Sequence, residues 1–353
     1  MSTSVGARTA GTAYDRDTRH SEPLLSVTDL SVVFQRHGEK PFTAVDKVSF
    51  EVRPGQTVGL VGESGSGKSV TNLALMGLLP ARGNTVTGTA VFEGTDLLRL
   101  TPSQMRERRG RDLGMIFQDP LSSLNPVVPI GIQVTEVLER HKGMSRKAAM
   151  PRAKEMLDKV GIPDPSRRLN EYPHQLSGGM RQRALIAMAL ACEPRLLIAD
   201  EPTTALDVTI QAQILQLLKD LVRDSGTALI MITHDLGVVA GLCDEVNVMY
   251  GGKIVERGQR HELFAAPRHP YTHGLLGSIP RLDGTRGEPL TPIPGSVADN
   301  LPWDNACAFA PRCSQPVDVC RRRTPEFVEE GVEALRCHNP VDPHAAGTWE
   351  GER

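Results

Sequence analysis

The 353-residue sequence lacks any apolar run long enough to cross a membrane as a helix. Its most apolar stretches, such as Leu196–Ala199 and Ala228–Ile232, have only the length of strands. The sequence also lacks a large excess of charge of either sign, since it has 40 Lys and Arg residues and 42 Asp and Glu residues, which gives a formal net charge of −2. Nucleic-acid binders carry a basic excess. We therefore expect a globular protein with neither a membrane span nor a nucleic-acid partner.

Cysteine is scarce, and six cysteines in a chain of this length are too few for a secreted protein held together by disulfides. Four of the six nevertheless fall between Cys307 and Cys337. The first 23 residues are rich in Ser, Thr, Gly and Arg and lack the apolar segment of a signal peptide. We predict that residues 1–23 form a disordered tail on a cytoplasmic protein.

Hydrophobic patterning predicts an α/β protein. We expect strands over Leu24–Phe34, Ala44–Val52, Gln56–Val61, Leu196–Ala199 and Ala228–Thr233, and helices over Lys68–Leu79 and Val208–Asp224. Residues Leu121–Glu171 carry further helical spacing. The order strand, helix, strand favours a mainly parallel sheet covered on both faces. Proline becomes frequent from Pro267, which marks the start of a loop-rich C-terminal segment.

The strongest local motif is the run Gly62-Glu63-Ser64-Gly65-Ser66-Gly67-Lys68-Ser69, which fits GxxxxGK[ST]. It lies between a predicted strand and a predicted helix, as a phosphate-binding loop requires. Glycines let the backbone wind so that its N–H groups point at phosphate oxygens, and the helix adds its positive end. We expect Lys68 to contact the β- and γ-phosphates and the Ser69 hydroxyl to bind Mg²⁺.

Two adjacent acids follow the apolar strand at Leu196–Ala199. Asp200 stands at the carboxyl end of that strand, where ligands collect in parallel α/β sheets. We expect its carboxylate to hold Mg²⁺, directly or through water, and Glu201 to polarise the attacking water. Combined with the lysine loop upstream, the pair predicts a nucleotide-hydrolysing site.

Three further motifs narrow the class: Phe117-Gln118-Asp119-Pro120, Leu176-Ser177-Gly178-Gly179-Met180-Arg181-Gln182, and His234 after a strand. This set, in this order, resembles the ATP-binding subunits of ABC transporters over roughly residues 25–258. The resemblance implies an ABC-type P-loop nucleotide-binding domain over residues 24–266. Such a domain has a mainly parallel core sheet, an antiparallel β subdomain and a helical subdomain, here at about 121–180, and residues 267–353 would form a C-terminal extension.

The resemblance also implies roles within one subunit, with ATP and Mg²⁺ as cofactors. Ser69, Asp200 and Gln118 would serve the magnesium ion, with Gln118 sensing both metal and water. Glu201 would be the general base, and His234, which would contact the γ-phosphate, is the runner-up for that task.

Other roles concern adenine and the second subunit. The run Ser177-Gly178-Gly179 would cap the γ-phosphate of the nucleotide on the opposite subunit, and Asp207 resembles the loop that crosses the dimer interface. Phe34 would stack on adenine, with Phe42 as a competitor.

Two observations favour transport over the other uses of this fold. Repair ATPases insert long coiled coils within the cassette, whereas only roughly a hundred residues separate Ser69 from Ser177 and no sustained heptads occur. Translation factors carry two cassettes in one chain, and this chain has one. A DNA-repair or translation ATPase is therefore disfavoured.

Three segments resemble the ATPases of oligopeptide and dipeptide importers in the peptide/nickel family: Phe117–Pro126, Glu201–Thr209 and His269–Pro280. The long C-terminal region favours the D-type over the F-type subunit. The implied partners are two transmembrane permeases, a second ATP-binding subunit, commonly a paralogous F-type chain, and an extracytoplasmic substrate-binding protein. The protein would lie peripherally on the cytoplasmic face of the cell membrane. Its cargo would be peptides, with nickel or another small cargo as the alternative.

Metal-ligand candidates of a second kind are Cys307, Cys313, Cys320 and Cys337. The segment Cys307–Cys313 resembles the C-terminal motif of peptide-importer ATPases, some of which hold an iron–sulfur cluster. Four thiolates suit a [4Fe–4S] cluster or tetrahedral zinc, and the lack of a Cys-x₂-Cys pair favours the cluster. Four free thiols are the remaining interpretation. Cys192 and Cys243 sit in apolar stretches and are expected in the core.

Overall fold

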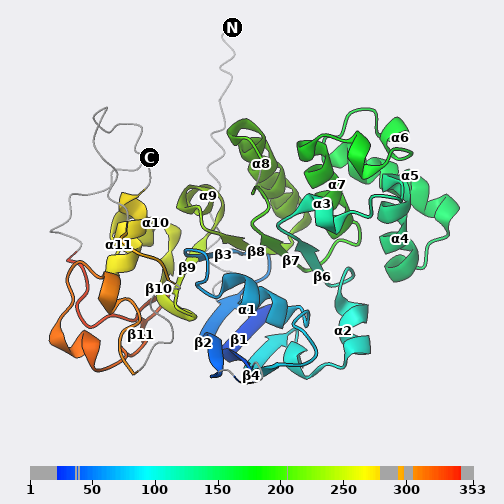
Figure 1. Ribbon diagram of the computed structural model, residues 1–353. Coiled ribbons are helices and arrows are strands. Elements are labelled where there is room, and N and C mark those ends of the chain that lie inside the picture. Colours follow the sequence, from blue (N-terminus) through cyan, green and yellow to red (C-terminus); the bar gives the residue numbers. More distant parts are fainter. Residues whose placement is uncertain are drawn as a thin grey trace, which may run out of the picture.

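The computed structural model describes residues 22–35, 38, 40–204, 206–278, 293–297 and 305–342. Most of the predicted tail, residues 1–21, lies outside the described residues. The described chain forms two sheets with helices around them (Figure 1).

The larger sheet has eight strands in the order β11-β12-β10-β9-β3-β8-β7-β6. They are β3 (Thr57–Val61), β6 (Leu113–Ile116), β7 (Leu196–Asp200), β8 (Ala228–Thr233), β9 (Glu245–Tyr250), β10 (Lys253–Gln259), β11 (Val328–Glu330) and β12 (Glu333–Leu335). The pairs from β9 through β3, β8 and β7 to β6 are parallel, which confirms the predicted parallel core. Every residue of β3, β7, β8 and β9 is buried, which agrees with their mostly apolar sequences.

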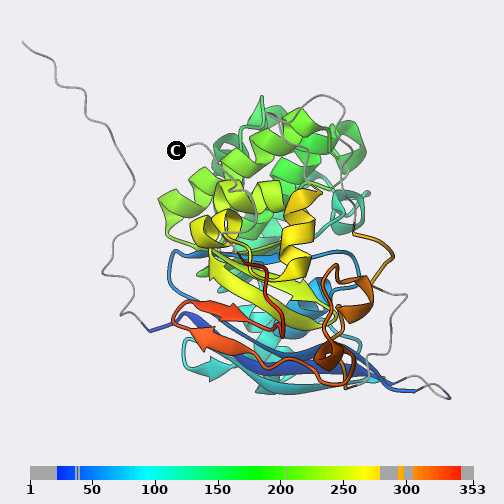
Figure 2. The same ribbon diagram turned by 90° about the vertical axis from the view of Figure 1, so that its left-hand side faces the viewer.

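A smaller antiparallel sheet has the order β2-β1-β4-β5. Its strands are β1 (Leu25–Phe34), β2 (Phe42–Val52), β4 (Asn84–Phe92) and β5 (Thr95–Asp96). Its buried side chains share one hydrophobic cluster with β3, β7 and β8 and with helix α1 (Lys68–Leu75). Figure 2 shows this sheet on one side of the larger sheet and most helices on the other.

Helix α1 ends at Leu75, so the predicted helix Lys68–Leu79 is too long by one turn. Gly77 takes a positive φ of 59° just beyond the end of α1.

The opposite face of the larger sheet is covered by α7 (Gly178–Leu190), α8 (Val208–Ser225) and α9 (Leu236–Leu242). Strand β7 serves both cores, because Leu197 and Ala199 pack with these helices while Leu196 and Ile198 pack toward the antiparallel sheet.

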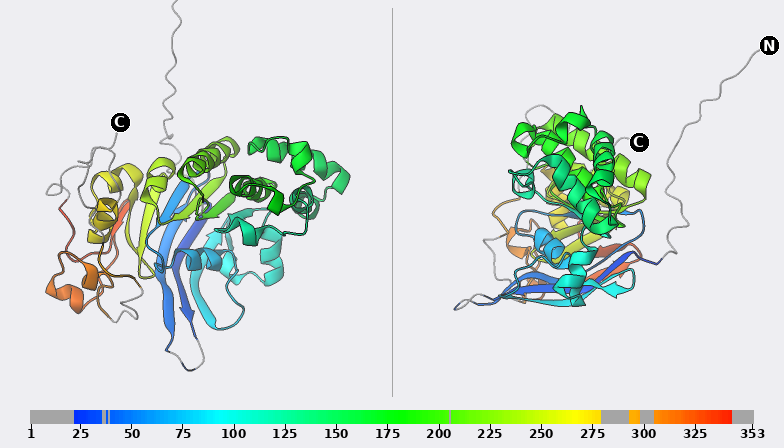
Figure 3. Two further views of the ribbon diagram at one scale, coloured as in Figure 1. Left: turned by 45° about the horizontal axis from the view of Figure 1, so that its top comes forward. Right: turned by 90° about the vertical axis from the view of Figure 1, so that its right-hand side faces the viewer.

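Further helices gather at one end of the molecule. They are α2 (Pro102–Arg108), α3 (Pro120–Ser123), α4 (Ile130–Lys142), α5 (Arg146–Lys159) and α6 (Pro165–Arg168). Figure 3 shows α4 and α5 at the end opposite the C-terminal segment. Within the described ranges, no helix combines the length and the apolarity that crossing a bilayer needs.

The C-terminal segment is built on the free edge of β10. Helix α10 (Arg260–Ala265) precedes it, and the segment itself contains α11 (Pro270–Gly277), two 3-10 turns at Ala310–Arg312 and Asp318–Arg321, and then β11 and β12. Strand β12 pairs with β10, with Glu256 opposite Leu335, so the segment extends the larger sheet. The prediction of a loop-rich segment did not include these two short strands.

Candidate active site

The loop of residues 62–69 joins the carboxyl end of β3 to α1, as predicted. Gly62 has φ 152° and Gly67 has φ 105°. A Cβ atom at Gly62 would lie 2.2 Å from the Met249 carbonyl oxygen, and one at Gly67 would lie 2.7 Å from the Ala44 carbonyl oxygen. Both positions therefore require glycine for space and for backbone conformation.

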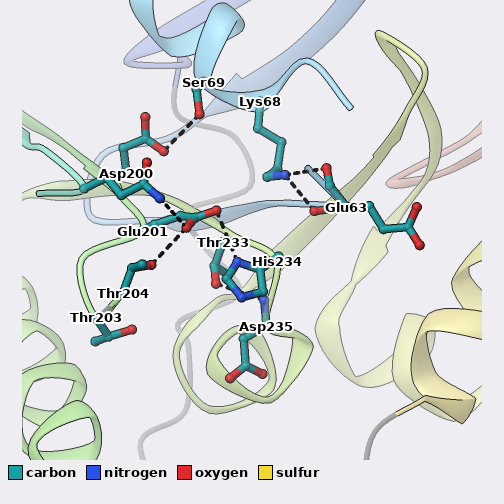
Figure 4. A network of polar contacts seen from close by, with 12 residues as sticks. Glu63, Lys68, Ser69, Asp200, Glu201, Thr203, Thr204, Thr233, His234 and Asp235 are labelled. Atoms are coloured by element: carbon teal, nitrogen blue, oxygen red, sulfur yellow. Dashed lines mark hydrogen bonds and ion pairs between the residues drawn. The ribbon is translucent and has the colours of Figure 1, made fainter. Parts of the chain in front are cut away.

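The loop curls around the ammonium group of Lys68. Lys68 Nζ donates hydrogen bonds to the carbonyl oxygens of Gly62 at 2.6 Å and Glu63 at 2.9 Å, and to Ser66 Oγ at 3.3 Å. Figure 4 shows Lys68 turned toward Glu63. Burial lowers the pKa of Lys68, and the nearby carboxylates of Glu201 and Asp200 oppose that effect. The result is a largely desolvated ammonium group held by oxygen atoms of its own loop, and a positive centre of this kind suits phosphate oxygens.

Asp200 ends β7 beside the start of α1 and is buried. Its Oδ1 accepts from the Ser69 hydroxyl and its Oδ2 from Asn72 Nδ2, each at 3.4 Å. Burial raises the pKa of Asp200, and the adjacent Glu201 charge adds to that rise. Hard oxygen donors from one hydroxyl and one carboxylate fit Mg²⁺, which keeps most of its waters and binds phosphate oxygens.

Glu201 stands next in the chain and has a positive φ of 46°. Its Oε2 accepts from Gln118 Nε2 and from Thr204 Oγ1, each at 2.9 Å, and His234 Nδ1 lies 3.1 Å from its Oε1. Burial alone would raise the pKa of Glu201, but hydrogen bonds from His234 and Thr204 outweigh burial and lower it. The carboxylate is therefore kept ionised and oriented at a strained backbone position.

Sheet topology explains why these groups meet. Strands β3, β8 and β7 are parallel neighbours, so the phosphate loop, His234 and Asp200 all follow the carboxyl ends of adjacent strands. The structure thus brings together the predicted residues Lys68, Ser69, Gln118, Asp200, Glu201 and His234.

The predicted residues for the opposite subunit lie at the starts of two other helices. Ser177 Oγ accepts from Met180 N at 3.3 Å at the start of α7, and Asp207 Oδ1 accepts from Ile210 N at 3.0 Å at the start of α8. A Cβ atom at Gly179 would lie 3.0 Å from Ile210 Cγ2, so the two helix starts touch. Within the described chain, no hydrogen bond joins Ser177 to residues 62–69.

The two candidates for adenine stacking face each other. Phe34 at the end of β1 pairs in register with Phe42 at the start of β2. Phe42 is exposed and Phe34 is half-buried. Their role stays a prediction.

Sequence reasoning missed four residues that contact this site: Asn72, Thr204, Tyr271 and Arg312. Asn72 and Thr204 each lie three positions after a predicted site residue, a spacing that places helical neighbours together and could have indicated Asn72. Tyr271 and Arg312 bind Glu63 from more than 200 positions away, and no local spacing indicates such contacts.

The four clustered cysteines are free thiols close to one another. The Cys307 N–H donates to the Cys320 carbonyl at 2.8 Å, and burial together with the other three thiols raises the pKa of Cys337 to about 12. Among the described residues, however, no group of three or more His, Cys, Asp or Glu side chains is arranged to hold a metal ion. The structure therefore does not support the predicted cluster or zinc site. Cys192 and Cys243 are buried in the core, as expected.

Comparison with solved structures shows the class of protein. The ATP-binding cassette MJ0796, solved as a dimer in a post-hydrolysis state with ADP and Pi, matches with a TM-score of 0.59 and 28% identity, covering 67% of this chain and 98% of that one. The cbiO1 protein of Clostridium perfringens, part of the ABC transporter complex cbiONQ, matches with a TM-score of 0.58 and 26% identity over 69% of this chain and 91% of its own. These neighbours are ABC cassettes.

Sequence comparison is more specific. Residues 45–204 match the family model for the ABC transporter, and residues 255–320 match the model for the oligopeptide/dipeptide transporter C-terminal region. The dipeptide transport ATP-binding protein DppD of Bacillus subtilis is 54% identical over 90% of this chain and 94% of its own length. The oligopeptide transport ATP-binding protein OppD of Salmonella typhimurium is 49% identical over the same shares. The chain belongs to this family of ABC transporter ATPases, the ATP-binding subunits of oligopeptide and dipeptide transporters.

Proposed function

We propose that this ATPase energises the import of di- or oligopeptides across the cell membrane. The observation that carries the chemistry is the convergence of Lys68, Asp200, Glu201 and His234 at the carboxyl edge of three adjacent parallel strands. The cargo is supported by peptide-transporting relatives that are 54% and 49% identical and by the match at residues 255–320. The proposed division is an ATPase domain over residues 24–266 and an extension over 267–353.

In the proposed site, Ser69 and Asp200 hold Mg²⁺, with Gln118 within reach of the same space. Bound there, the ion neutralises charge on the β- and γ-phosphates. Lys68 moves its hydrogen bonds from backbone carbonyls to phosphate oxygens. The buried ammonium group thus keeps hydrogen-bond partners when phosphate binds. The new bonds to charged phosphate oxygens are stronger than those to carbonyl oxygens, which favours phosphate binding.

Glu201 orients and polarises the attacking water. Its low pKa keeps the carboxylate ionised, and the hydrogen bonds from Thr204 and His234 fix its direction. His234 is also exposed on its other side, which leaves the ring free to contact a γ-phosphate. Glu201 thus positions the attacking water and His234 the γ-phosphoryl group that is transferred to it, with ADP as the leaving group.

We propose that a second ATP-binding subunit completes the site with its own Ser177-Gly178-Gly179 and Asp207. In this chain those residues make their own contacts at the starts of α7 and α8 rather than with the phosphate loop. A dimeric arrangement is supported by the dimer of MJ0796. The second subunit in the assembly is proposed to be a paralogous F-type chain.

The remaining proposed partners are two transmembrane permeases and an extracytoplasmic substrate-binding protein. Exposed apolar side chains near the Gln118 loop support permease docking there, since Phe117, Val127 and Tyr172 are 42%, 77% and 37% exposed. Docking at Phe117 and along residues 121–171 would hold the protein on the cytoplasmic face of the membrane.

Uptake assays test this proposal. Vesicles carrying the complete transporter should accumulate a labelled di- or tripeptide only with ATP and the binding protein. Uptake of Ni²⁺ without peptide uptake would favour the alternative cargo in the same family. ATP hydrolysis that is indifferent to permeases and binding protein would instead favour a non-transport ATPase.

We also keep the hypothesis that Cys307, Cys313, Cys320 and Cys337 hold a [4Fe–4S] cluster, with zinc as the alternative. Its support is the resemblance of Cys307–Cys313 to the C-terminal motif of peptide-importer ATPases and the backbone contact of Cys307 with Cys320, whose N–H and carbonyl groups lie 2.8 Å apart. Ligation would require a local rearrangement of the segment, because the present arrangement does not form a ligand set. Such a site would act as a structural staple, since ATP hydrolysis needs no electron transfer.

A further inference from the structure

We propose that Arg312 of the C-terminal segment is a positioning residue for ATP binding, which acts by holding Glu63 in the phosphate loop. The inference rests on the proposed role of residues 62–69 in binding phosphate. It makes the C-terminal segment a working part of the nucleotide site rather than an appendage to it.

The first observation is a two-point ion pair across 249 positions of sequence. Arg312 Nη1 lies 2.6 Å from Glu63 Oε2, and Arg312 Nη2 lies 3.0 Å from Glu63 Oε1. The Arg312 side chain is only 3% exposed and the Glu63 side chain 29%. A bidentate pair of this kind, with its arginine buried, fixes direction as well as distance.

The second observation is that Arg312 is itself held rigidly. Its Nε donates to the Pro294 carbonyl at 2.7 Å, and its Nη2 donates to the Gly295 carbonyl at 3.1 Å. Its guanidinium carbon lies 5.7 Å from the centre of the Tyr250 ring. Contacts other than the one with Glu63 thus fix the position of the guanidinium group. Arg312 can therefore restrain the position of the phosphate loop.

The third observation concerns the backbone of Glu63. Its N–H donates to the Tyr271 hydroxyl at 2.8 Å, and its carbonyl accepts from Lys68 Nζ at 2.9 Å. Figure 4 shows the Glu63 carboxylate pointing away from Lys68 while the carbonyl faces it. The C-terminal segment therefore holds two of the three polar groups of Glu63, and the third receives the phosphate-binding lysine.

Both contacts belong to one packed unit. Phe309 lies three residues before Arg312, and its ring centre is 5.1 Å from that of Tyr250 and 5.3 Å from that of Tyr271. Arg312 and Tyr271 thus approach the loop from a common aromatic cluster. A displacement of the Cys307–Cys313 segment would be transmitted to Glu63 through this cluster.

The physical consequence is a selective effect on nucleotide affinity. Without Arg312, Glu63 would be an unpaired carboxylate on a loop that must receive several negative charges, and the loop would be less ordered. Both effects oppose ATP binding. The groups around the hydrolysed bond, Asp200, Glu201 and His234, do not contact Arg312. We therefore expect Arg312→Gln to raise the KM for MgATP about tenfold and to change kcat less than about threefold.

The test measures KM and kcat in the assembled transporter, together with the melting temperature of the full chain. Arg312→Gln, Glu63→Gln and the double variant form a cycle. The matched control is Arg336→Gln, which removes a half-buried arginine of the same segment that binds the Ile254 and Pro325 carbonyls and stacks on Phe327. Arg312→Lys should recover part of the affinity because it restores the charge but not the two-point geometry.

The proposal predicts a raised KM in each single variant, a double variant no worse than the poorer single one, and a normal KM in Arg336→Gln. It is overturned by a normal KM in Arg312→Gln, by additive effects, or by an equal rise in Arg336→Gln. If Arg312→Gln does not fold, Glu63→Gln carries the test, since it leaves the carbonyl contacts of Arg312 intact. Lys68→Ala distinguishes failure of the Arg312 proposal from failure of the proposed phosphate loop. Normal ATP affinity in that variant would refute the assignment of residues 62–69 as the phosphate loop.

Discussion

Glu201 Oε1 and His234 Nδ1 lie 3.1 Å apart, although the two residues are 33 positions apart in sequence. They follow the neighbouring parallel strands β7 and β8, so the sheet itself sets their separation. The contact lowers the pKa of Glu201 and aims its carboxylate. This pair is the centre of the proposed hydrolytic machinery.

His234→Ala should therefore change the pH profile as well as the rate. Loss of the hydrogen bond lets burial raise the pKa of Glu201, so the carboxylate protonates at a higher pH. We expect kcat to fall about 10²-fold or more and its acid limb to move toward neutral pH. The measurement is kcat against pH in the assembled transporter. An unmoved acid limb would contradict the proposed coupling of the two residues.

Lys68→Ala should abolish tight ATP binding without unfolding the protein. The variant removes the buried cation of the phosphate loop. The carbonyl groups of Gly62 and Glu63 lose one hydrogen-bond donor, but no unpaired charge is left buried, so the fold should persist. We expect MgATP affinity to fall at least about tenfold. Equilibrium binding of a fluorescent ATP analogue checks this, with Lys219→Ala on the exposed face of α8 as the control. Equal losses in both variants would argue against a specific phosphate contact.

Glu256 should make stability depend on pH. Burial raises its pKa to about 7, above the ordinary value of 4.5, while the N–H groups of Arg268 and His269 bind its oxygens. A carboxyl group with a raised folded pKa favours folding at low pH, and that contribution is lost as pH rises from 4.5 to about 7. The loss is at most about 3 kcal/mol.

Glu256→Gln should therefore flatten the dependence of melting temperature on pH between pH 4.5 and about 7, the ordinary and the raised pKa of this carboxyl group. Its absolute stability should fall by about 1–3 kcal/mol at low pH, because the glutamine oxygen can accept only one of the two backbone hydrogen bonds and the amide NH2 leaves the other N–H unpaired. Parallel thermal melts of the two proteins across this range check it. An identical pH slope in both proteins would exclude Glu256 as its source.

The clustered cysteines distinguish three outcomes in one preparation. Protein purified without oxygen should contain iron and acid-labile sulfide near four of each per chain if the cluster forms. One tightly held zinc with little iron would favour the alternative. Four titratable thiols with neither metal would match the arrangement in this structure and end the metal hypothesis.

The parts of the site that the sequence predicted are those with short, fixed spacing. The phosphate loop, the Asp200–Glu201 pair and His234 each follow a buried strand, and strand ends are readable from apolar runs. The helix after Lys68 was placed one turn too long because its apolar pattern continues to Leu79 while the backbone turns at Gly77.

Other parts depend on tertiary contacts that no spacing encodes. Strand β11 is exposed at every residue, and β12 has only three residues, so neither carries a periodic signal. The contact of Arg312 with Glu63 joins segments that are distant in sequence. In the sequence alone, Arg312 cannot be told from an ordinary surface arginine. Such contacts arise from the way the C-terminal segment packs on the β10 edge.

The rate of ATP hydrolysis by Glu201→Gln in the assembled transporter tests the central claim most directly. The substitution keeps the size of the side chain and its contacts with Gln118 and Thr204 but removes the negative charge that polarises water. The account predicts a loss of about 10²–10⁴-fold in kcat with ATP binding retained and a closed pair of subunits stabilised. Hydrolysis at the wild-type rate would contradict it and make His234 the next candidate for the base.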